Sequence, residues 1–486
     1  MITEVEKIVT CFRSCFSREA AFDWFVIVVL AMILRLDHHG VTPIIRWLVL
    51  DPTHYNGRLW FFRAGSWRLE EVRNQWCQVV GEKFPLAYVN GRAVLLGDSI
   101  KVAKQAERMP AVKRLHQEEN MASKPEYILG HHHGVVGVLV QGVAKRLCVP
   151  VAAELQEGMA EIRRLQGKET APAPQGKVDA RPTLVTRMAD LALAVAGALR
   201  MPSYGVFDAF YAAQTLFKRV APVVDAPSQR LLHVIVKGKR RYVGYQAVGS
   251  VTGKRPVGRP PTYGEKVKLW DLFETAAGQF VERSLSLYGE AHRIEYLCLN
   301  LLWKPLGEKI RFVLVRDQER RYLLMCSDLG LMPEAIIGLY ATRFKIEGTL
   351  KMLKCLLGAF FYHFWTGAWP QGEKKGVVDL TGIKAGHPTA QLISMTTEAI
   401  ERFVNLGGIA LGILQYLAVI FPERIWGQYT GWLRTRTSVI PSEEVVQAVV
   451  RQEVFFNFLQ FQSGLIYRVI QAKRRTATPG AQKKVA

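Results

Sequence analysis

The sequence predicts a mixed α/β protein whose core is interrupted by a mostly β insertion and flanked by helical regions at both ends. Three patterns support this fold class. Apolar residues recur at helical spacing up to about residue 88 and again after residue 330. Short β-type runs alternate with helical segments in residues 89–238, as they do in α/β cores. Strand-like runs then dominate residues 239–329.

Composition and charge narrow the class of protein. The chain has 486 residues, of which 49% are hydrophobic and 22% are charged, which excludes intrinsic disorder as its main state. Lys and Arg outnumber Asp and Glu by 64 to 42, and the resulting net charge of +22 favours a polyanionic partner such as nucleic acid. The seven cysteines form no Cys-x-x-Cys pair, which argues against a disulfide scaffold or a structural zinc site.

Residues 1–88 are expected to form a compact helical module. Residues 24–34 are an uninterrupted apolar run, shorter than the roughly 20 residues that span a bilayer, and therefore predict a buried helix. The chain opens with Met-Ile-Thr-Glu-Val-Glu rather than with the basic start of a secretion signal, so we expect a cytoplasmic protein without a membrane partner. Aromatic and basic side chains interleave in the module, at Arg46, Trp47, Tyr55, Arg58, Trp60, Phe61, Arg63, Trp67 and Arg68.

The first part of the core is assigned to residues 89–238. Its β-type runs lie at residues 93–96, 135–140, 147–152, 204–207 and 231–236. Asp98 follows the first of these runs and Asp208 follows the fourth. Sites in open α/β sheets assemble at the carboxyl ends of strands, so both carboxylates are candidates for chemistry. The alternative for each aspartate alone is a turn residue at a strand end.

Residues 239–329 are assigned to the insertion, which begins with a basic segment. Between residues 237 and 268, nine Lys or Arg accompany a single acid, Glu265, and Gly and Pro interrupt the stretch. Arg255 and Arg259 in this segment are predicted DNA contacts. They belong either to an arm that enters a minor groove or to a solvated loop that tracks phosphates.

A helix is predicted over residues 333–358, with proline in its first turn and glycine at its end. At 100° per residue, Tyr340, Arg343, Glu347 and Lys354 share one stripe, and a neighbouring apolar stripe can pack on a sheet. The alternative is a surface helix with ordinary charge pairs. Residues 330–370 are therefore assigned to the core, as the segment with the catalytic-glutamate helix, and residues 371–486 to a C-terminal helical region with a basic tail.

Packing of this helix on the sheet would bring Glu347 alongside Asp98 and Asp208. Three carboxylates within a few ångström raise one another's pKa values, so such a cluster persists mainly where divalent cations neutralise it. The three acids therefore predict a divalent-metal site.

Together, these motifs resemble the DDE transposases of bacterial insertion sequences, and specifically the group that carries a Tyr-Arg-Glu-Lys signature. The matching motifs occur in the family's order over most of residues 90–370. They are Gly97-Asp98-Ser99-x-Lys101, Gly130-His131-His132-His133-Gly134, Phe207-Asp208-Ala209-Phe210-Tyr211 and Tyr340-x2-Arg343-x3-Glu347-x6-Lys354.

The resemblance implies a ribonuclease H-like core in which Asp98, Asp208 and Glu347 are catalytic and hold two Mg2+ ions, with Mn2+ as a substitute. Two such ions stabilise the attacking and the leaving oxygen of an in-line displacement at phosphorus. The same acids would then serve both DNA cleavage and strand transfer.

The resemblance also implies roles for the other residues of the signature. Tyr340, Arg343 and Lys354 would grip phosphates of the transposon end and assist hairpin formation. Lys101 and Lys104 follow the first aspartate, and they either lie beside the scissile phosphate or line a helix face.

The expected function is that of an insertion-sequence transposase, which cleaves DNA at the ends of the element and joins them to target DNA. The N-terminal module would recognise the ends. Since two ends are cut and joined together, we expect a homodimer on DNA, associated with the nucleoid of a prokaryote. The alternatives are a catalytically inactive DNA-binding regulator derived from a transposase and a domesticated DNA nuclease.

Two further features have open interpretations. Consecutive strand residues point to opposite faces, so His131, His132 and His133 do not converge on one metal, and contacts to the DNA backbone or hydrogen bonds in a turn are predicted instead. Trp303 either stacks on an unpaired base or belongs to the core of the insertion.

Overall fold

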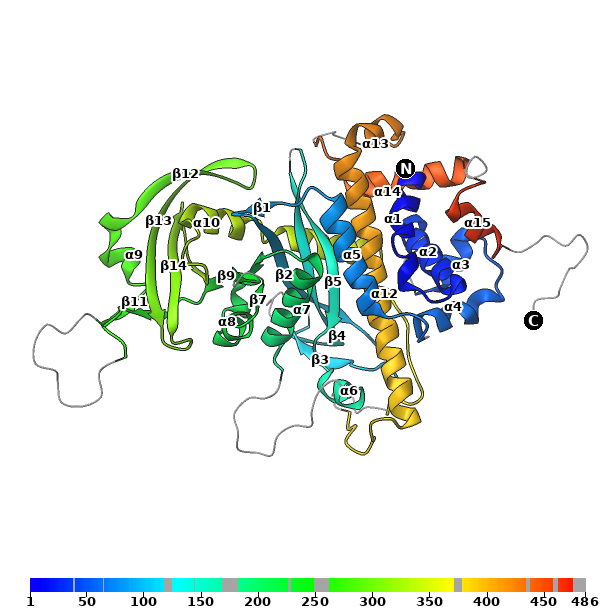
Figure 1. Ribbon diagram of the computed structural model, residues 1–486, viewed down its shortest axis with the longest axis horizontal. Coiled ribbons are helices and arrows are strands. Elements are labelled where there is room, and N and C mark those ends of the chain that lie inside the picture. The colour runs from blue at the N-terminus through cyan, green and yellow to red at the C-terminus, as the bar shows by residue number, and fades with distance from the viewer. Residues whose placement is uncertain are drawn as a thin grey trace, which may run out of the picture.

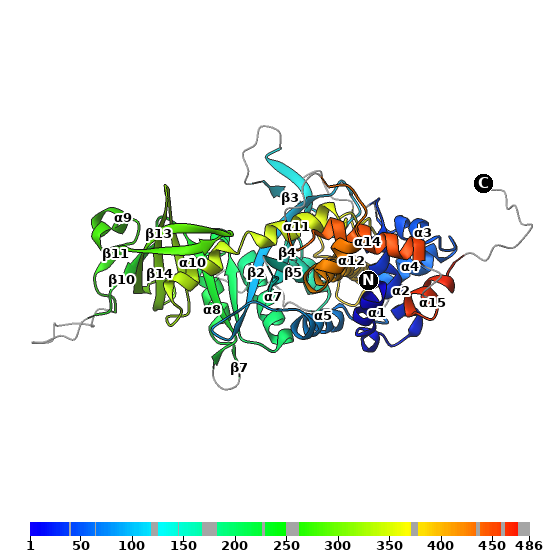
Figure 2. The same cartoon turned by 90° about the horizontal axis from the view of Figure 1, so that it is seen from above.

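The computed structural model describes residues 1–37, 40–63, 65–117, 125–143, 145–167, 182–225, 229–248, 262–370, 378–433, 438–457 and 462–474. In Figure 1 the insertion lies at one end of the long axis, the central strands follow, and the helices of both termini gather at the other end. Figure 2 shows the same succession from above.

The terminal helices form one layer. Helix α2 is apolar all round, and its residues 24–34 are all buried, which confirms the predicted buried helix. The N-terminal ammonium group lies 2.6 Å from the carboxylate of Glu453, which ties the two ends of the chain together. The N-terminal helices are α1 (Ile2–Thr10), α2 (Glu19–Leu34), α3 (Thr42–Leu48), α4 (His54–Arg63) and α5 (Leu69–Lys83), and the C-terminal ones are α12 (Pro388–Ile420), α13 (Pro422–Gln428), α14 (Glu443–Asn457) and α15 (Leu465–Gln471).

Helix α12 runs between the N-terminal helix α2 and the central strand β5 (Figure 1). Among the described residues it is the one helix whose length and composition would suit a membrane span, and 89% of its most apolar window is buried inside the fold.

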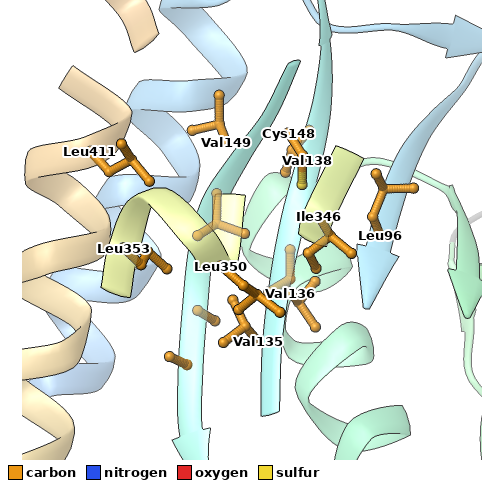
Figure 3. Packing of buried hydrophobic residues seen from close by; sticks show 14 of the residues in the cluster. Leu96, Val135, Val136, Val138, Cys148, Val149, Ile346, Leu350, Leu353 and Leu411 are labelled. Atoms are coloured by element: carbon orange, nitrogen blue, oxygen red, sulfur yellow. The ribbon is translucent and has the colours of Figure 1, made fainter. Parts of the chain in front are cut away.

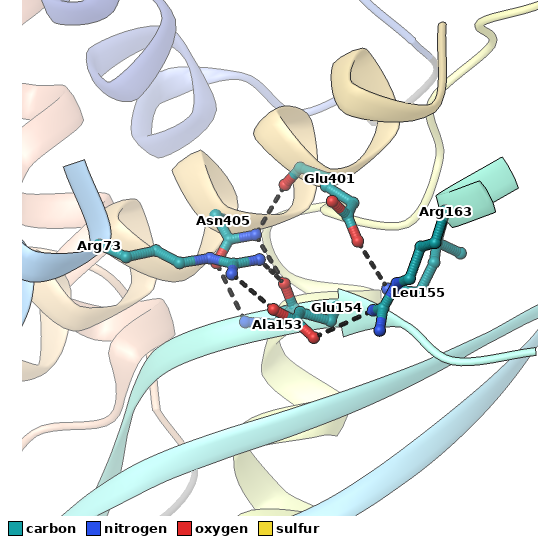
Figure 4. A network of polar contacts seen from close by, with 7 residues as sticks. All are labelled: Arg73, Ala153, Glu154, Leu155, Arg163, Glu401 and Asn405. Atoms are coloured by element: carbon teal, nitrogen blue, oxygen red, sulfur yellow. Dashed lines mark hydrogen bonds and ion pairs between the residues drawn. The ribbon is translucent and has the colours of Figure 1, made fainter. Parts of the chain in front are cut away.

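A partly buried polar network fixes α12 and α5 to strand β5 (Arg146–Leu155) (Figure 4). Arg73 of α5 lies 2.9 Å from Oε1 of Glu154, and Arg163 lies 3.4 Å from Oε2 of the same carboxylate. Asn405 of α12 donates to the carbonyl of Ala153 at 2.9 Å. Burial opposes ionisation of Glu154, but Arg73 and then Arg163 outweigh it and lower its pKa. The carboxylate is therefore charged, and its partners hold three elements in register.

The central strands combine antiparallel and parallel pairing. Strand β2 pairs antiparallel with β4 and parallel with β6, and β6 pairs parallel with β9. The short strands β7 (Val224–Asp225) and β8 (Gln229–Arg230) form a separate hairpin. The central strands are β1 (Tyr88–Val89), β2 (Arg92–Ala103), β3 (Lys113–His116), β4 (Tyr127–Gln141), β5 (Arg146–Leu155), β6 (Ser203–Phe207) and β9 (Leu232–Gly238), and the intervening helices are α6 (Ala160–Leu165), α7 (Leu184–Leu199) and α8 (Gln214–Val220).

The insertion continues the central sheet rather than forming a separate one. Strand β15 pairs antiparallel with β9, from Leu323 opposite Gly238 to Cys326 opposite Ile235, so one sheet of 13 strands runs through both regions. The insertion contains β10 (Val243–Tyr245), β11 (Lys266–Lys268), α9 (Leu272–Thr275), β12 (Val281–Leu287), β13 (Glu290–Trp303), β14 (Glu308–Asp317) and β15 (Arg320–Cys326).

Helices cover both faces of the central strands. A Cβ on Gly97 would lie 2.4 Å from the ring of Phe207 and 3.2 Å from the sulfur of Met188 on α7, so this residue of β2 faces α7. Its neighbour Leu96 faces the other way, toward Ile346 of helix α11 (Lys345–Cys355; Figure 3). The apolar stripe predicted for residues 333–358 is buried on that second face, at Leu339, Ile346, Leu350, Leu353 and Leu357.

The prediction of one continuous helix over residues 333–358 is wrong. Helix α10 (Pro333–Ala341) and helix α11 (Lys345–Cys355) are separate. Between them the backbone bonds shorten to i→i−3 spacing, from Thr342 to Leu339 and from Arg343 to Tyr340. The hydroxyl of Thr342 also donates to the carbonyl of Leu339 at 2.7 Å. This bond adds to the two i→i−3 backbone bonds that close the turn between the two helices.

Candidate active site

Asp98 lies on β2, and Asp208 directly follows the neighbouring parallel strand β6. Leu96 of β2 is in register with Val206 of β6, and Asp98 and Asp208 each follow two residues later. Since alternate residues share a face and Gly97 and Phe207 lie toward α7, both carboxylates project toward α11. Asp208 also accepts a hydrogen bond from the backbone of Phe210 at 3.0 Å, which fixes its orientation.

The sequence predicted Asp98 at the end of a strand, but the residue lies within β2. The parallel pairing of β2 with β6 stops at Leu96, but the antiparallel pairing with β4 continues to Ala103. Strand β2 therefore extends past the end of β6, and Asp98 stands beside the edge that this mismatch leaves.

Arg343 connects Asp98 to Glu347. Nη1 of Arg343 lies 3.2 Å from Oδ2 of Asp98, and Nη2 contacts Oε1 of Glu347 one turn further along. The side chains of Arg343 and Asp98 are 19% and 18% exposed, whereas that of Glu347 is 56% exposed. The break between α10 and α11 places this arginine in the gap between a strand acid and a helix acid.

The charges of the cluster act on one another. The pKa of Asp98 is raised to about 6: burial is the largest cause, the hydrogen bond from Ser99 and the charge of Arg343 oppose the rise, and the negative charges of Asp208 and Glu347 add to it. Burial also raises the pKa of Tyr340 to about 12, against the charge of Arg343 and with a smaller contribution from Asp208. The side chains of Asp98, Asp208, Tyr340, Arg343 and Glu347 are therefore close enough to interact electrostatically.

The three carboxylates are suitable ligands for a divalent cation, and Arg343 neutralises part of their negative charge in this structure. Carboxylate oxygens are the ligands that Mg2+ prefers. In the described part of the chain, however, no three His, Cys, Asp or Glu side chains stand close enough together to hold one ion. The guanidinium of Arg343 contacts the carboxylates of both Asp98 and Glu347.

A cleft of about 670 Å3 opens beside the cluster and is lined by Asp98, Asp208, Lys101 and Lys354. Lys101 lies on β2, so the alternative that it lines a helix face is wrong, and its ammonium group donates to the carbonyl of His116 at 2.8 Å. Lys104 is buried and donates to the carbonyls of Phe360 and Tyr362, which removes it from the cleft. Arg255 and Arg259 lie outside the described residues.

Residues 11–279 match the family described as DDE superfamily endonuclease, and this match spans more than half of the chain. The chain belongs to the DDE superfamily endonuclease family. The matched part of this DDE endonuclease contains Asp98 and Asp208 and ends before Glu347. Membership supports nuclease activity with DNA as the substrate.

The other comparisons add little. No curated protein matches the DDE endonuclease in sequence. Among solved structures, the NurA nuclease from Sulfolobus solfataricus is 11% identical, with 56% of this chain and 81% of that chain covered and a TM-score of 0.20. A similarity at this level carries no inference about fold or function.

Two residues of the cleft were not expected from the sequence. His132 of β4 stands opposite Lys101 in the register with β2, and its Nδ1 lies 3.3 Å from Oε1 of Glu157. Both side chains line the cleft of the DDE endonuclease together with Asp98. The available signal was the alternation of side chains along a strand, which sends His132 to the face opposite that of His131 and His133.

The flanking histidines and Trp303 are structural. His131 and His133 are fully buried, and their rings lie 2.6 and 2.8 Å from the hydroxyl of Tyr362, so the predicted hydrogen bonds to DNA or within a turn are wrong. Trp303 is 3% exposed and packs against Phe217, with 5.5 Å between ring centroids, which selects the core alternative.

Proposed function

We propose that this DDE endonuclease is an insertion-sequence transposase of the group with the Tyr-Arg-Glu-Lys signature, which cleaves DNA at the ends of an element and transfers the strands into target DNA. One observation carries the proposal. Asp98 on β2 and Asp208 directly after β6 each follow the last registered pair of these parallel strands by two residues, and Arg343 links Glu347 to Asp98 from a helix packed on the same face. This arrangement supports the ribonuclease H-like core that the sequence motifs imply.

In the proposed mechanism, Asp98, Asp208 and Glu347 would hold two Mg2+ ions, which activate the attacking oxygen and stabilise the leaving oxygen of the phosphodiester. With a pKa of about 6, Asp98 is largely ionised at the neutral to alkaline pH of such reactions and can act as a ligand. Lys101 and Lys354 line the cleft, where their positive charge would attract the DNA backbone.

Arg343 and Tyr340 would act on the phosphate next to the cleaved bond. A guanidinium matches two phosphate oxygens at once, and Tyr340 is close enough to Arg343 to hydrogen-bond with it and orient it. We also propose that the domains of the chain are divided after residues 88, 238, 329 and 370 and that the N-terminal module binds the transposon ends. The protein is proposed to act as a homodimer on DNA. Arg255 and Arg259 remain predicted DNA contacts.

The test is a cleavage assay with the full-length chain, Mg2+ and labelled duplexes taken from the DNA that flanks the coding sequence. Cutting at one position followed by joining to a second duplex supports the transposase. Cutting without joining would instead indicate a DNA nuclease, and tight binding without cutting would indicate a catalytically inactive regulator.

Single substitutions then test each acid. Asp98→Asn, Asp208→Asn and Glu347→Gln should each abolish cleavage and leave DNA binding largely intact in a gel-shift assay. Glu319→Gln, an exposed acid in the turn between β14 and β15, is the matched control and should cut normally. Retained cleavage in any one of the three variants removes that residue from the proposed metal set.

A further inference from the structure

A single guanidinium group contacts two of the three proposed metal ligands. Nη1 of Arg343 lies 3.2 Å from Oδ2 of Asp98, and Nη2 contacts Oε1 of Glu347. The arginine and the aspartate are each less than a fifth exposed, so water screens their interaction weakly. Arg343 therefore supplies a local countercharge to the acidic cluster.

Both oxygens of Asp98 are already hydrogen-bonded. Oδ1 accepts the backbone N–H of Ser99 at 2.7 Å, and Oδ2 accepts from Arg343. A divalent cation binds a carboxylate oxygen at about 2.0 to 2.6 Å, depending on the ion. A guanidinium kept at hydrogen-bond distance from the same oxygen would place a like charge directly beside that cation, which is unfavourable in a partly buried site.

We propose that Arg343 and the divalent metal compete for Asp98 and Glu347, so that metal binding releases the arginine from the two acids toward a DNA phosphate in the cleft. The inference rests on the proposed metal-dependent function. It makes Arg343 a positioning residue for the metal ligands as well as a DNA contact.

The competition couples metal binding to DNA binding. Whatever draws Arg343 away from the acids strengthens metal binding, and by thermodynamic reciprocity the metal strengthens the interaction that receives the arginine. A phosphate in the cleft is a suitable recipient because Lys101 and Lys354 line the same space as Asp98. The protein would thus bind metal weakly when free and strongly when DNA is present.

The test measures binding of Mn2+, by electron paramagnetic resonance of the free ion, to the full-length chain with and without the flanking DNA duplex. In the wild type, DNA should lower the Kd for Mn2+ by a factor of roughly 5 to 150, the usual range of such coupling. In Arg343→Gln, the Kd without DNA should fall about tenfold, and the effect of DNA should largely disappear. Arg343→Lys keeps the charge but cannot span two carboxylates with one planar group, so it should shift the Kd in the same direction.

A matched control separates competition from a simple loss of positive charge. Lys354→Gln removes one cation from the same cleft and leaves the bridge of Arg343 in place. Equal tightening of Mn2+ binding in Lys354→Gln and Arg343→Gln would overturn the proposal. So would unchanged or weaker binding in Arg343→Lys, provided that its circular dichroism spectrum matches the wild type.

The same titration distinguishes failure of this inference from failure of the proposed function. If Asp98→Asn removes no Mn2+ site that the wild type has, the metal-dependent function itself is wrong. If Mn2+ binds at Asp98 but its affinity is insensitive to Arg343, only the competition is refuted.

Discussion

Asp98→Asn should stabilise the fold at alkaline pH while it removes catalysis. Burial raises the pKa of Asp98 to about 6, well above the ordinary value of about 3.9, so the folded state holds this proton more tightly than the unfolded state does. The contribution of the protonated group to stability is therefore fully present below about pH 4 and is lost as the pH rises through 6. Asparagine cannot ionise and escapes this loss.

The magnitude follows from the pKa difference. About two pH units between the folded and unfolded pKa values correspond to about 3 kcal/mol of unfolding free energy. The side chain of Asp98 is only 18% exposed, so solvent screening reduces this value little. Asparagine also keeps an acceptor for the N–H of Ser99, which lies 2.7 Å from Oδ1. We expect the variant to be more stable by up to about 3 kcal/mol at pH 8 and to equal the wild type near pH 4.

The assay is urea denaturation of both proteins in EDTA at pH 4, 5, 6, 7 and 8, followed by tryptophan fluorescence. Addition of Mg2+ at pH 8 should then stabilise the wild type and not Asp98→Asn, because only the wild type retains the ligand. Glu319→Gln serves as the control and should follow the wild type. A difference in stability that is the same at pH 4 and pH 8 would refute the assigned cost of the buried carboxylate.

Three other substitutions test the packing around the site, each by the urea midpoint. Tyr362→Phe removes the hydroxyl that pairs with two buried histidines and should cost about 1–3 kcal/mol; a cost below about 0.5 kcal/mol would contradict that role. Gly97→Ala should cost about 1–3 kcal/mol because its Cβ would lie 2.4 Å from the ring of Phe207. Gly197→Ala is the control and should be neutral or stabilising, because its Cβ would meet no atom within 4 Å. Equal effects of the two substitutions would contradict the close approach at Gly97. Arg73→Ala should cost about 1–3 kcal/mol, because the partly buried carboxylate of Glu154 loses its shorter ion pair and keeps the longer one to Arg163; a cost below about 0.5 kcal/mol would show that water screens the pair.

Local patterns in the sequence predicted much of the fold. Apolar runs located β2, β4, β5 and β6, and the helical repeat located the stripe of α11 that is buried against the sheet. These features depend on neighbours within a few residues, so periodicity is sufficient to find them. Strand ends were less accurate, because β2 continues for as long as β4 is available to pair with it.

Features that depend on distant residues could not be predicted. Burial of His131 and His133 depends on Tyr362, which is more than 200 residues away. The break after α10 lies at a tight turn with i→i−3 backbone bonds, which helical periodicity does not register. In the candidate site, the sequence motifs named the three acids, but the bridge that Arg343 makes between two of them emerged only from the arrangement of strand and helix.

The pairing of β15 with β9 has a consequence for how the chain can be shortened. Residues 232–238 are a hydrophobic strand whose second neighbour arrives only after about 80 further residues have been synthesised. Until then, or if the insertion were deleted, this strand would present unpaired backbone groups at an open edge, a known route to aggregation. A catalytic fragment without the insertion is therefore expected to be less soluble than the full-length chain even if every acid were retained, because β15 is needed to cover this edge of the sheet.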